Sequence, residues 1–341
     1  MRHATGSEPG QAFAGLPARD KVLLAEMGPR WAADINANRQ AVVDIYTPVL
    51  AAASRAAIRI TSDLSYGPHA RNRLDIYQPA AAIDARASVS ASLPVVVFVH
   101  GGAFLRGNMN SNAEIYGNVP RYFARHGFVA INLEYRLAPE AAYPGGAQDV
   151  ADAVAWIRQH IAAYGGNPAH IVLVGHSAGG AHAAAYVLDP VLNPVPHESG
   201  AGKAEAAASS GISGLILISA RLRADVLPGN PNAAGVRAYW GEDSSLYEQM
   251  SPVTHAARMN TPAMVVIAEF ENPYLDAYGA EFFHRIVDAA NAPGAVKFSH
   301  RFLQIPRHNH TSIVAHLDTA DQSLGPALID FVTSTRPLAP S

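Results

Sequence analysis

Apolar residues near the start of the chain recur at intervals of three and four, the spacing that places them on one face of a helix. The pattern extends from Pro17 to about Ala57 and predicts two helices before any strand. Its apolar positions are Val22, Leu23, Met27, Trp31, Ile35, Val42, Val43, Ile45, Tyr46, Val49 and Leu50. Ile58 and Ile60 then alternate with polar residues, and the segment 73–79 (RLDIYQP) follows a turn rich in Gly, Pro and Asn. This alternation indicates an antiparallel hairpin at the edge of a sheet.

Further along, short apolar runs alternate with helical stretches. The runs are LPVVVFVH (93–100), FVAINLEY (128–135), IVLVG (171–175), LILIS (215–219), AMVVIA (263–268) and FSHRFLQI (298–305). Because most of them lack polar alternation, they predict strands buried on both faces, as in a parallel sheet covered by helices. Between two of the runs, Val150, Val154, Ile157 and Ile161 form one helical stripe within 146–164. We therefore predict an α/β fold with a mostly parallel central sheet, right-handed crossovers and helices on both faces.

Two segments break this alternation. Residues 189–211 are rich in Pro, Ala, Gly and Ser, so we expect a flexible surface loop or short insertion without a function of its own. Residues 221–260 lie between two predicted core strands and are long enough to contribute to a lid. No internal repeat is evident, which argues against a solenoid.

The composition narrows the class of protein. The 341 residues are 49% hydrophobic and 16% charged, which suits one large domain, with or without a lid. The net charge is −3 and no run of Lys or Arg occurs, so nucleic acid is not an expected partner. No long apolar stretch resembles a signal or a membrane span, and we expect a cytoplasmic protein without a membrane partner.

The chain contains no cysteine, which excludes disulfides, thiolate zinc sites and cysteine nucleophiles. Any covalent acyl transfer must therefore use serine. The most informative motif is IVLVGHSAGGAHAAAYVL (171–188), in which a predicted strand leads through GHSAG straight into an Ala-rich helix. Small neighbours let the backbone bend sharply and present the Ser177 hydroxyl at the carboxyl edge of the sheet. The helix N-terminus favours negative charge there, so we predict Ser177 as a nucleophile.

A second motif, VVVFVHGGAF (95–104), ends another predicted strand in His100 and three small residues. Small residues after a strand allow backbone N–H groups to turn toward a ligand oxygen. We predict an oxyanion hole formed by the N–H groups of Gly102, Ala103 and Ala178. Loss of one such donor typically costs about 2.7–4 kcal/mol of transition-state stabilisation. His100 itself is expected to be structural, bonding to loop carbonyls.

A serine nucleophile needs a base, and in this strand-turn-helix context the order along the chain is Ser, acid, His. The last predicted strand, 298–305, is followed by PRHNHTSIV, which offers His308 and His310. We favour His310, since it lies next to Thr311 and Ser312 at the start of the final helix, and keep His308 as the alternative. The HNH sequence alone does not predict a metal site, because further ligands at suitable spacing are missing.

The acid should follow the preceding strand, AMVVIA (263–268). Glu269, Glu271 and Asp276 all lie there, and we favour Glu271 because Asp276 falls in the next predicted helix. A carboxylate at this position orients the imidazole of the base and stabilises its charged form.

Together these motifs resemble the hormone-sensitive-lipase-like branch of the bacterial carboxylesterases, which have the α/β-hydrolase fold. The resemblance covers residues from about Leu64 to Phe331 and rests on HGGAF (100–104), EYRLAPEAAYPGGAQDVADAVAWI (134–157), YGGNPAHIVLVGHSAGG (164–180) and SPVTHA (251–256). It is similar, more distantly, to arylformamidases and to xylan or feruloyl esterases. The resemblance implies a helical cap from residues 1–57, to which 221–260 contribute, over a catalytic domain formed by 58–336.

The chain departs from this family at three positions. Ala103 stands where the family has a third glycine, which preserves the N–H donor. His176 replaces the more usual Asp or Thr before the nucleophile, and Glu271 stands at the position where the family commonly has Asp. The change at His176 leaves the subfamily, and therefore the substrate, open.

The sequence thus predicts a serine carboxylesterase that hydrolyses small to medium esters through a Ser177–His310–Glu271 triad, with no metal and no organic cofactor. An arylformamidase-like amidase or an acyltransferase would use the same machinery, and a non-catalytic receptor would be expected to lack part of the triad. The expected partner is a small-molecule ester. A homodimer is one arrangement compatible with the sequence, which does not define the oligomeric state.

Substrate contacts are harder to assign, because aromatic residues also fill cores. For the substrate pocket we consider Phe104, His176 and Trp240, together with Leu105, Trp31 and Tyr239.

Overall fold

The computed structural model describes residues 12–80, 92–190, 192, 211–335 and 337. Two helices precede the first strand, as the apolar spacing predicts: α1 (Ala18–Met27) and α2 (Ile35–Ala51), joined by the 3-10 helix η1 (Gly28–Ala33). Most of the loop predicted at 189–211 lies outside the described residues. Within the described part of the chain, no helix is long and apolar enough to cross a membrane.

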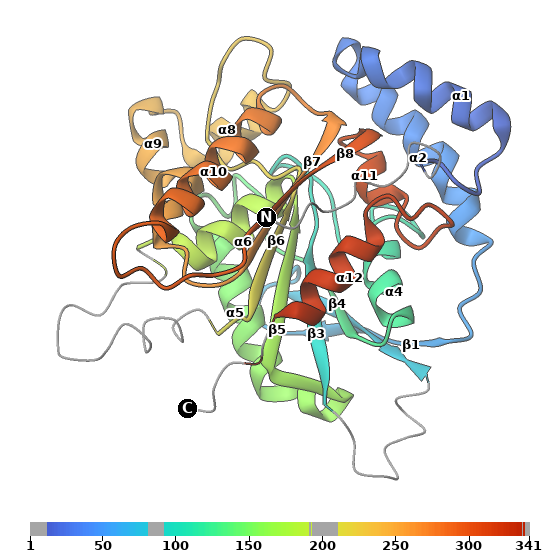
Figure 1. Ribbon diagram of the computed structural model, residues 1–341, viewed down its shortest axis with the longest axis horizontal. Helices are drawn as coiled ribbons and strands as arrows, with labels where there is room; N and C mark the ends of the chain where they lie inside the picture. The colour runs from blue at the N-terminus through green and yellow to red at the C-terminus, as the bar shows by residue number, and fades with distance from the viewer. Residues whose placement is uncertain (1–11, 81–91, 191, 193–210, 336, 338–341) are drawn as a thin grey trace.

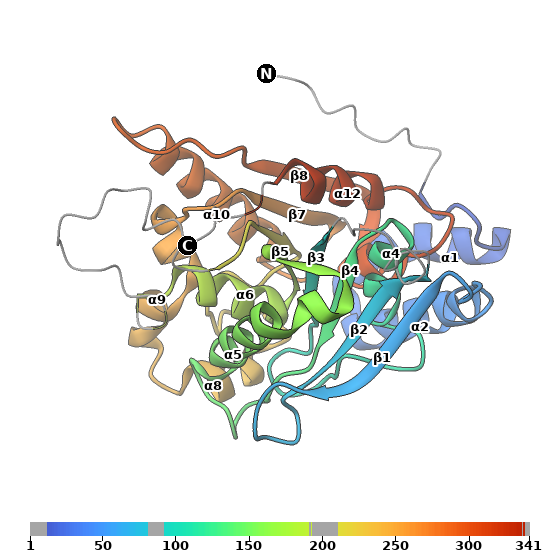
Figure 2. The ribbon, with the colours of Figure 1, turned by 90° about the horizontal axis from the view of Figure 1, so that it is seen from below.

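The described residues form one sheet of eight strands in the order β1-β2-β4-β3-β5-β6-β7-β8 (Figures 1 and 2). The predicted hairpin lies at one edge, where β1 pairs antiparallel with β2 and β2 pairs antiparallel with β4. All other neighbours run parallel. The strands are β1 (Ile58–Ser65), β2 (Arg73–Pro79), β3 (Leu93–Val99), β4 (Val129–Leu133), β5 (Gly166–His176), β6 (Gly214–Ile218), β7 (Ala263–Phe270) and β8 (Arg301–Asn309).

The last strand lies later in the chain than expected. It runs over Arg301–Asn309 rather than 298–305, and therefore includes Pro306 and His308. Proline cannot donate a hydrogen bond to a neighbouring strand, but β8 is an edge strand and has a neighbour on one side only. The pairing with β7 ends with Phe270 opposite Asn309, so the two strands finish side by side.

Helices cover both faces of the sheet, as predicted (Figure 2). Apolar residues of α5, α6 and α10 share one hydrophobic cluster with the odd-numbered valines of β3, and those of α4 and α12 share the other cluster with Val96 and Phe98. Burial on both faces explains why these strands lack polar alternation. The helices are α4 (Asn118–Arg125), α5 (Gly145–His160), α6 (Ala178–Leu188), α8 (Ala233–Trp240), α9 (Tyr247–Met250), α10 (Leu275–Ala290), α11 (Ser312–Ala315) and α12 (Gly325–Ser334), with 3-10 helices η3 (Ile161–Tyr164), η4 (Ser244–Leu246) and η5 (Pro252–Arg258).

The N-terminal helices have a separate apolar core that joins them to the carboxyl edge of the sheet. Trp31, Tyr46 and Leu50 are buried there together with Ile115 and Ala315, and Phe270 packs against them. Burying one large apolar side chain contributes about 1.5–3 kcal/mol. Figure 1 shows α2 beside α11, at the end of the sheet where β7 and β8 finish.

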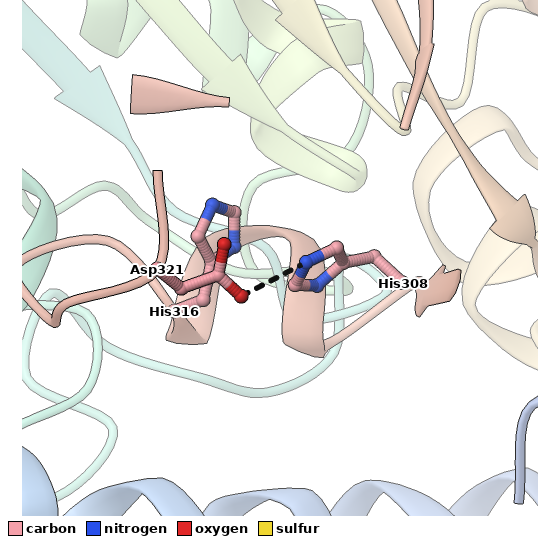
Figure 3. Close-up of side chains that lie close together, drawn as sticks. All are labelled: His308, His316 and Asp321. Carbon is pink, nitrogen blue, oxygen red and sulfur yellow. Dashed lines mark ion pairs between the residues drawn. The ribbon is translucent and has the colours of Figure 1, made fainter. Parts of the chain in front are cut away.

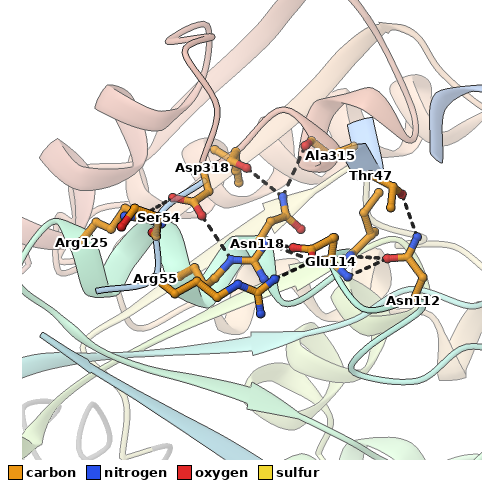
Figure 4. Close-up of polar contacts among 12 residues, drawn as sticks. Thr47, Ser54, Arg55, Asn112, Glu114, Asn118, Arg125, Ala315 and Asp318 are labelled. Carbon is orange, nitrogen blue, oxygen red and sulfur yellow. Dashed lines mark hydrogen bonds and ion pairs between the residues drawn. The ribbon is translucent and has the colours of Figure 1, made fainter. Parts of the chain in front are cut away.

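A polar network fixes the other end of this N-terminal segment (Figure 4). Glu114 accepts from Arg55 at 2.5 Å and from Arg121 at 2.9 Å. Asp318 accepts from Arg121 at 3.2 Å and from Arg125 at 2.5 Å, and Arg125 also donates to the carbonyl of Ser54. Arg121 is almost fully buried and pairs with both carboxylates, so its replacement would leave each buried carboxylate with a single arginine partner.

Two buried histidines make the fold sensitive to acid. Burial, assisted by the charge of a neighbouring histidine, lowers the pKa of His182 in α6 from 6.5 to about 3 and that of His316 after α11 to about 4. At a pH between these lowered pKa values and 6.5, the two histidines are protonated in the unfolded chain but neutral in the folded chain. Their contribution to stability is therefore fully present above pH 6.5 and is lost as the pH falls toward 4. Each histidine should contribute a slope of about 1.4 kcal/mol per pH unit there.

We therefore expect the melting temperature to fall steadily between pH 7 and pH 5 in a calorimetric titration. The exposed His160 provides the control, because His160→Gln should leave this slope unchanged. A melting temperature that is flat over the same range would contradict the interpretation.

Candidate active site

Ser177 lies on the sharp bend between β5 and α6, where the motif predicts it. Its backbone has φ 54° and ψ −118°, a conformation that non-glycine residues rarely adopt. Two backbone hydrogen bonds hold the bend. The N–H of Ser177 donates to the carbonyl of Ile218 at 3.1 Å, and the carbonyl of Ser177 accepts from the backbone N–H of Arg221 at 3.0 Å. A Cβ at Gly179 would lie 2.2 Å from the carbonyl oxygen of Val99, so only glycine lets α6 start this close to β3.

The structure brings together the three residues that the sequence predicts as a triad. The hydroxyl of Ser177 donates to Nε2 of His310 at 3.1 Å, and Nδ1 of His310 donates to Oε2 of Glu271 at 2.8 Å. The side chains of His310 and Glu271 are 9% and 2% exposed, so both bonds lie in a site largely closed to water. The N–H of His310 also donates to the carbonyl of Phe270 at 3.1 Å, which fixes the base against the loop of the acid.

The carboxylate of Glu271 is held by further donors. Oε1 accepts from the N–H of Ala268 at 2.9 Å and from the hydroxyl of Ser219, while Oε2 accepts from the N–H of Asn272 at 3.3 Å. Ser219 follows β6, the strand between those of the nucleophile and the acid. Sequence reasoning overlooked it, although a serine that ends the apolar run LILIS at that edge of the sheet was the available signal.

The other two carboxylates near β7 take different positions. Glu269 is exposed and accepts from the N–H of Arg307 at 2.6 Å. Asp276 is exposed in the first turn of α10. Glu271, the acid favoured from the sequence, is therefore the one of these three carboxylates that contacts His310.

The loop after β3 presents unpaired backbone donors near the nucleophile. The N–H groups of Gly102, Ala103 and Ala178 have no backbone or side-chain acceptor in the part of the chain that the structure describes. The loop is tight, because the carbonyl of Gly102 accepts from the N–H of Arg106 at 3.0 Å. Gly102 has φ 158°, and a Cβ there would lie 1.7 Å from the carbonyl oxygen of Arg106. His100 is structural as expected, with its ring bonded to the Gly101 carbonyl at 2.7 Å and to Glu134 at 3.0 Å.

A cavity of about 310 Å³ opens onto Ser177 and His310. The N-terminal helices line part of it, through Trp31 and Ile35 among others, and Asn232 of the 221–260 segment also lines it. Trp31 donates from Nε1 to Oδ1 of Asn272 at 2.9 Å. The N-terminal segment therefore contacts the residue next to the acid.

Comparison with known proteins assigns a family. The family model described as BD-FAE matches residues 74–273, more than half of the chain. The chain belongs to the BD-FAE family. Similar solved structures include a hyperthermophilic esterase from the archaeon Pyrobaculum calidifontis, 19% identical with a TM-score of 0.64 over 92% of this chain and 96% of that one. Esterase B from Lactobacillus rhamnosis is 19% identical, with a TM-score of 0.61 over 93% of this chain and 97% of that one. The predicted α/β-hydrolase fold is confirmed.

Curated relatives of this BD-FAE protein include Esterase LipQ of Mycobacterium tuberculosis, 28% identical over 278 residues that cover 80% of this chain and 62% of LipQ. Human bile salt-activated lipase is 35% identical over 144 residues, which cover 38% of this chain and 18% of the lipase. The chain thus spans less than two thirds of the length of these relatives. They agree with the predicted resemblance to hormone-sensitive-lipase-like carboxylesterases.

Four of the side chains considered for the substrate pocket are not among the residues that line the cavity: Phe104, Leu105, Tyr239 and Trp240. Phe104 and Trp240 do not line the cavity of this BD-FAE protein, but pack with Tyr239 in a buried aromatic cluster, with ring centroids 4.7–5.0 Å apart. Phe104 has φ 69°, a turn of the loop at which its side chain enters this cluster. His176 does line the cavity, but its Nε2 donates to the carbonyl of His310 at 3.0 Å. Burial, together with the charge of His310, holds the pKa of His176 well below its usual value, so it acts as a neutral support for the base.

His308, the alternative base, faces other groups. Its ring nitrogens lie 3.1 Å from the hydroxyl of Ser312 and 3.3 Å from Asp321, with His316 beside them (Figure 3). His308, His316 and Asp321 are residues of types that can bind a metal, and their potential ligand atoms lie within 4.8 Å of one another. However, Asp321 already accepts from the N–H of Phe13 at 2.6 Å, and the two histidine rings pack with centroids 4.3 Å apart. We interpret the cluster as a buried anchor for the N-terminal segment.

The bond from Ser219 to Glu271 generates a prediction. Ser219→Ala removes one donor from a buried carboxylate, so Glu271 should hold His310 less firmly. We expect kcat for ester hydrolysis to fall about tenfold, equivalent to roughly 1.4 kcal/mol, with little change in KM.

Steady-state kinetics would measure this effect. Ser213→Ala is the matched control, because Ser213 lies just before β6 at its other end and bonds to the carbonyl of Ala169 at 3.2 Å. Equal kcat values for the two variants would show that Ser219 does not support the acid.

Proposed function

We propose that this BD-FAE protein is a serine carboxylesterase, which hydrolyses small to medium carboxylic esters through an acyl-enzyme. The observation that carries the proposal is the continuous hydrogen-bonded line from Ser177 through His310 to Glu271. Relatives whose names describe esterases, such as LipQ and the probable carboxylic ester hydrolase LipM of Mycobacterium tuberculosis, support it.

In the first half of the reaction, His310 accepts the proton of the Ser177 hydroxyl as the oxygen attacks the ester carbonyl. Negative charge then develops on the carbonyl oxygen. The free N–H groups of Gly102, Ala103 and Ala178 supply donors for this oxyanion, and the positive end of the α6 dipole adds to their effect. Collapse of the tetrahedral intermediate expels the alcohol, which receives its proton from His310.

In the second half, His310 deprotonates a water molecule that attacks the acyl-enzyme, and Ser177 leaves with the proton. Glu271 keeps Nδ1 of His310 protonated and stabilises the imidazolium in both halves. This mechanism uses no metal and no organic cofactor. In the same proposal, the N-terminal helices and residues 221–260 form a cap over the cavity, because both contribute to its lining.

Ser177→Ala tests the nucleophile. We expect kcat for p-nitrophenyl acetate and butyrate to fall by at least about a thousandfold, because no other group can form the acyl-enzyme. Circular dichroism would establish that the variant is folded. Turnover within tenfold of the unmodified protein would refute the assignment.

Glu271→Gln tests the acid. The amide has no charge to stabilise the imidazolium and also presents a donor, so kcat should fall by roughly three to four orders of magnitude. Glu271→Asp keeps the charge but shortens the side chain, and its kcat should lie between those of the amide variant and the unmodified protein. The exposed Glu269 offers the control, since Glu269→Gln should retain activity. If the Glu269 and Glu271 amide variants behaved alike, the acid would lie elsewhere.

A further inference from the structure

The charges that line the catalytic cavity are of one sign. Two arginines line it, Arg39 from α2 and Arg106 from the loop after β3, together with Tyr116, His176 and the base. No Asp or Glu is among the described lining residues. The chain as a whole is acidic, with a net charge of −3, so a cavity with two cations and no anion is a local feature of the site.

Neither arginine has a partner among the residues that the structure describes. The side chains of Arg39 and Arg106 make no hydrogen bond and no ion pair within the part of the chain that the structure describes, and Nε of Arg39 is buried without any acceptor. Nearby arginines behave differently. Arg55, Arg121 and Arg125 all pair with carboxylates at 2.5–3.2 Å. Arg39 is half-buried and Arg106 is exposed, so both guanidinium groups, which keep their protons, are accessible to an anion from outside.

The positive charges of Arg39 and Arg106 also repel each other. Burial lowers the pKa of Arg106, and the charge of Arg39 lowers it further. Both charges act on Tyr116, where they oppose the effect of burial, which raises the pKa of its hydroxyl to about 12. An anion bound between the arginines would relieve this repulsion.

Tyr116 lines the same cavity as the two arginines and lies near the nucleophile. A Cβ built on Gly101 would lie 3.1 Å from the hydroxyl oxygen of Tyr116 and also 3.1 Å from Cβ of Ser177. The tyrosine hydroxyl and Cβ of Ser177 therefore both lie against Gly101, and all three residues line the cavity. Arg39, Arg106 and Ser177 line the same cavity of about 310 Å³, so one small molecule can contact the arginines and place an ester carbonyl at Ser177.

We propose that Arg39 and Arg106 bind a carboxylate of the substrate, so that the cavity selects esters with a free carboxylate a few carbon atoms from the scissile bond. This inference rests on the proposed esterase function and names its substrate class. Two guanidinium groups provide planar, paired donors that match a carboxylate, and a cavity of about 310 Å³ suits a small molecule.

The experiment compares matched esters with and without the charge. Monoethyl adipate and ethyl hexanoate differ by a carboxylate on the acyl side, and para-acetoxybenzoate and para-cresyl acetate differ by one on the alcohol side. We expect kcat/KM to be at least about tenfold higher for the charged ester of one pair, mainly through a lower KM. Raising the ionic strength should reduce this ratio, because salt screens the attraction.

Variants of Arg39 and Arg106 test whether these two side chains cause the preference for charged esters. Arg39→Gln and Arg106→Gln should each lower the ratio of kcat/KM for the charged and neutral esters by about tenfold. Arg39→Lys, which keeps the charge but loses the planar donors, should lower it less. The control is Arg19→Gln, because Arg19 is exposed on α1 and does not line the cavity. The ratio within one protein cancels any general loss of activity.

The outcomes separate this inference from the proposed function. Turnover of neutral esters with ratios near one in both pairs, unchanged by salt and by the arginine variants, would overturn the carboxylate site and leave the esterase proposal intact. Failure to hydrolyse any ester, charged or neutral, would overturn the esterase proposal itself. A salt-sensitive preference that both glutamine variants reduce would establish the site.

Discussion

The site depends on one constraint: neighbouring parallel strands end at the same edge of the sheet. The strands β5, β6, β7 and β8 are consecutive in the sheet, and each is followed at once by a residue of the hydrogen-bonded line. Ser177, Ser219, Glu271 and His310 come from positions far apart in the chain, yet they are hydrogen-bonded in the order Ser177, His310, Glu271, Ser219. The sheet therefore sets the geometry, and the local turns only aim the side chains.

The N-terminal helices take part in the site rather than merely covering it. Trp31 bonds to Asn272, whose N–H donates to Glu271, and Arg39 lines the cavity from the same segment. This segment is attached by an apolar core around Tyr46 and by the ion pair of Arg55 with the buried Glu114 at its far end. In the proposed enzyme, this segment would supply substrate selectivity because it lines the cavity, while the residues that follow the strands supply the chemistry.

The parts of this site that depend on local rules were predictable from the sequence. GHSAG between an apolar run and a helix predicts the bend at Ser177, because small residues are needed on either side of it. The position of Ser219 at this edge of the sheet could be seen in LILIS, but its bond to Glu271 and the pairing of His308 with Asp321 depend on which segments become neighbours. Phe104 was misassigned because an aromatic residue beside a catalytic loop has the same sequence signature whether it faces substrate or core.

The central claim is that the Ser177 hydroxyl is activated by His310 to form a covalent acyl-enzyme. The most direct measurement is mass spectrometry of the protein after reaction with a fluorophosphonate probe, with the adduct located by peptide mapping. The account predicts a single adduct on Ser177, formed much more slowly when His310 is replaced by alanine. An adduct on another residue, or labelling of Ser177 at the same rate without His310, would contradict it.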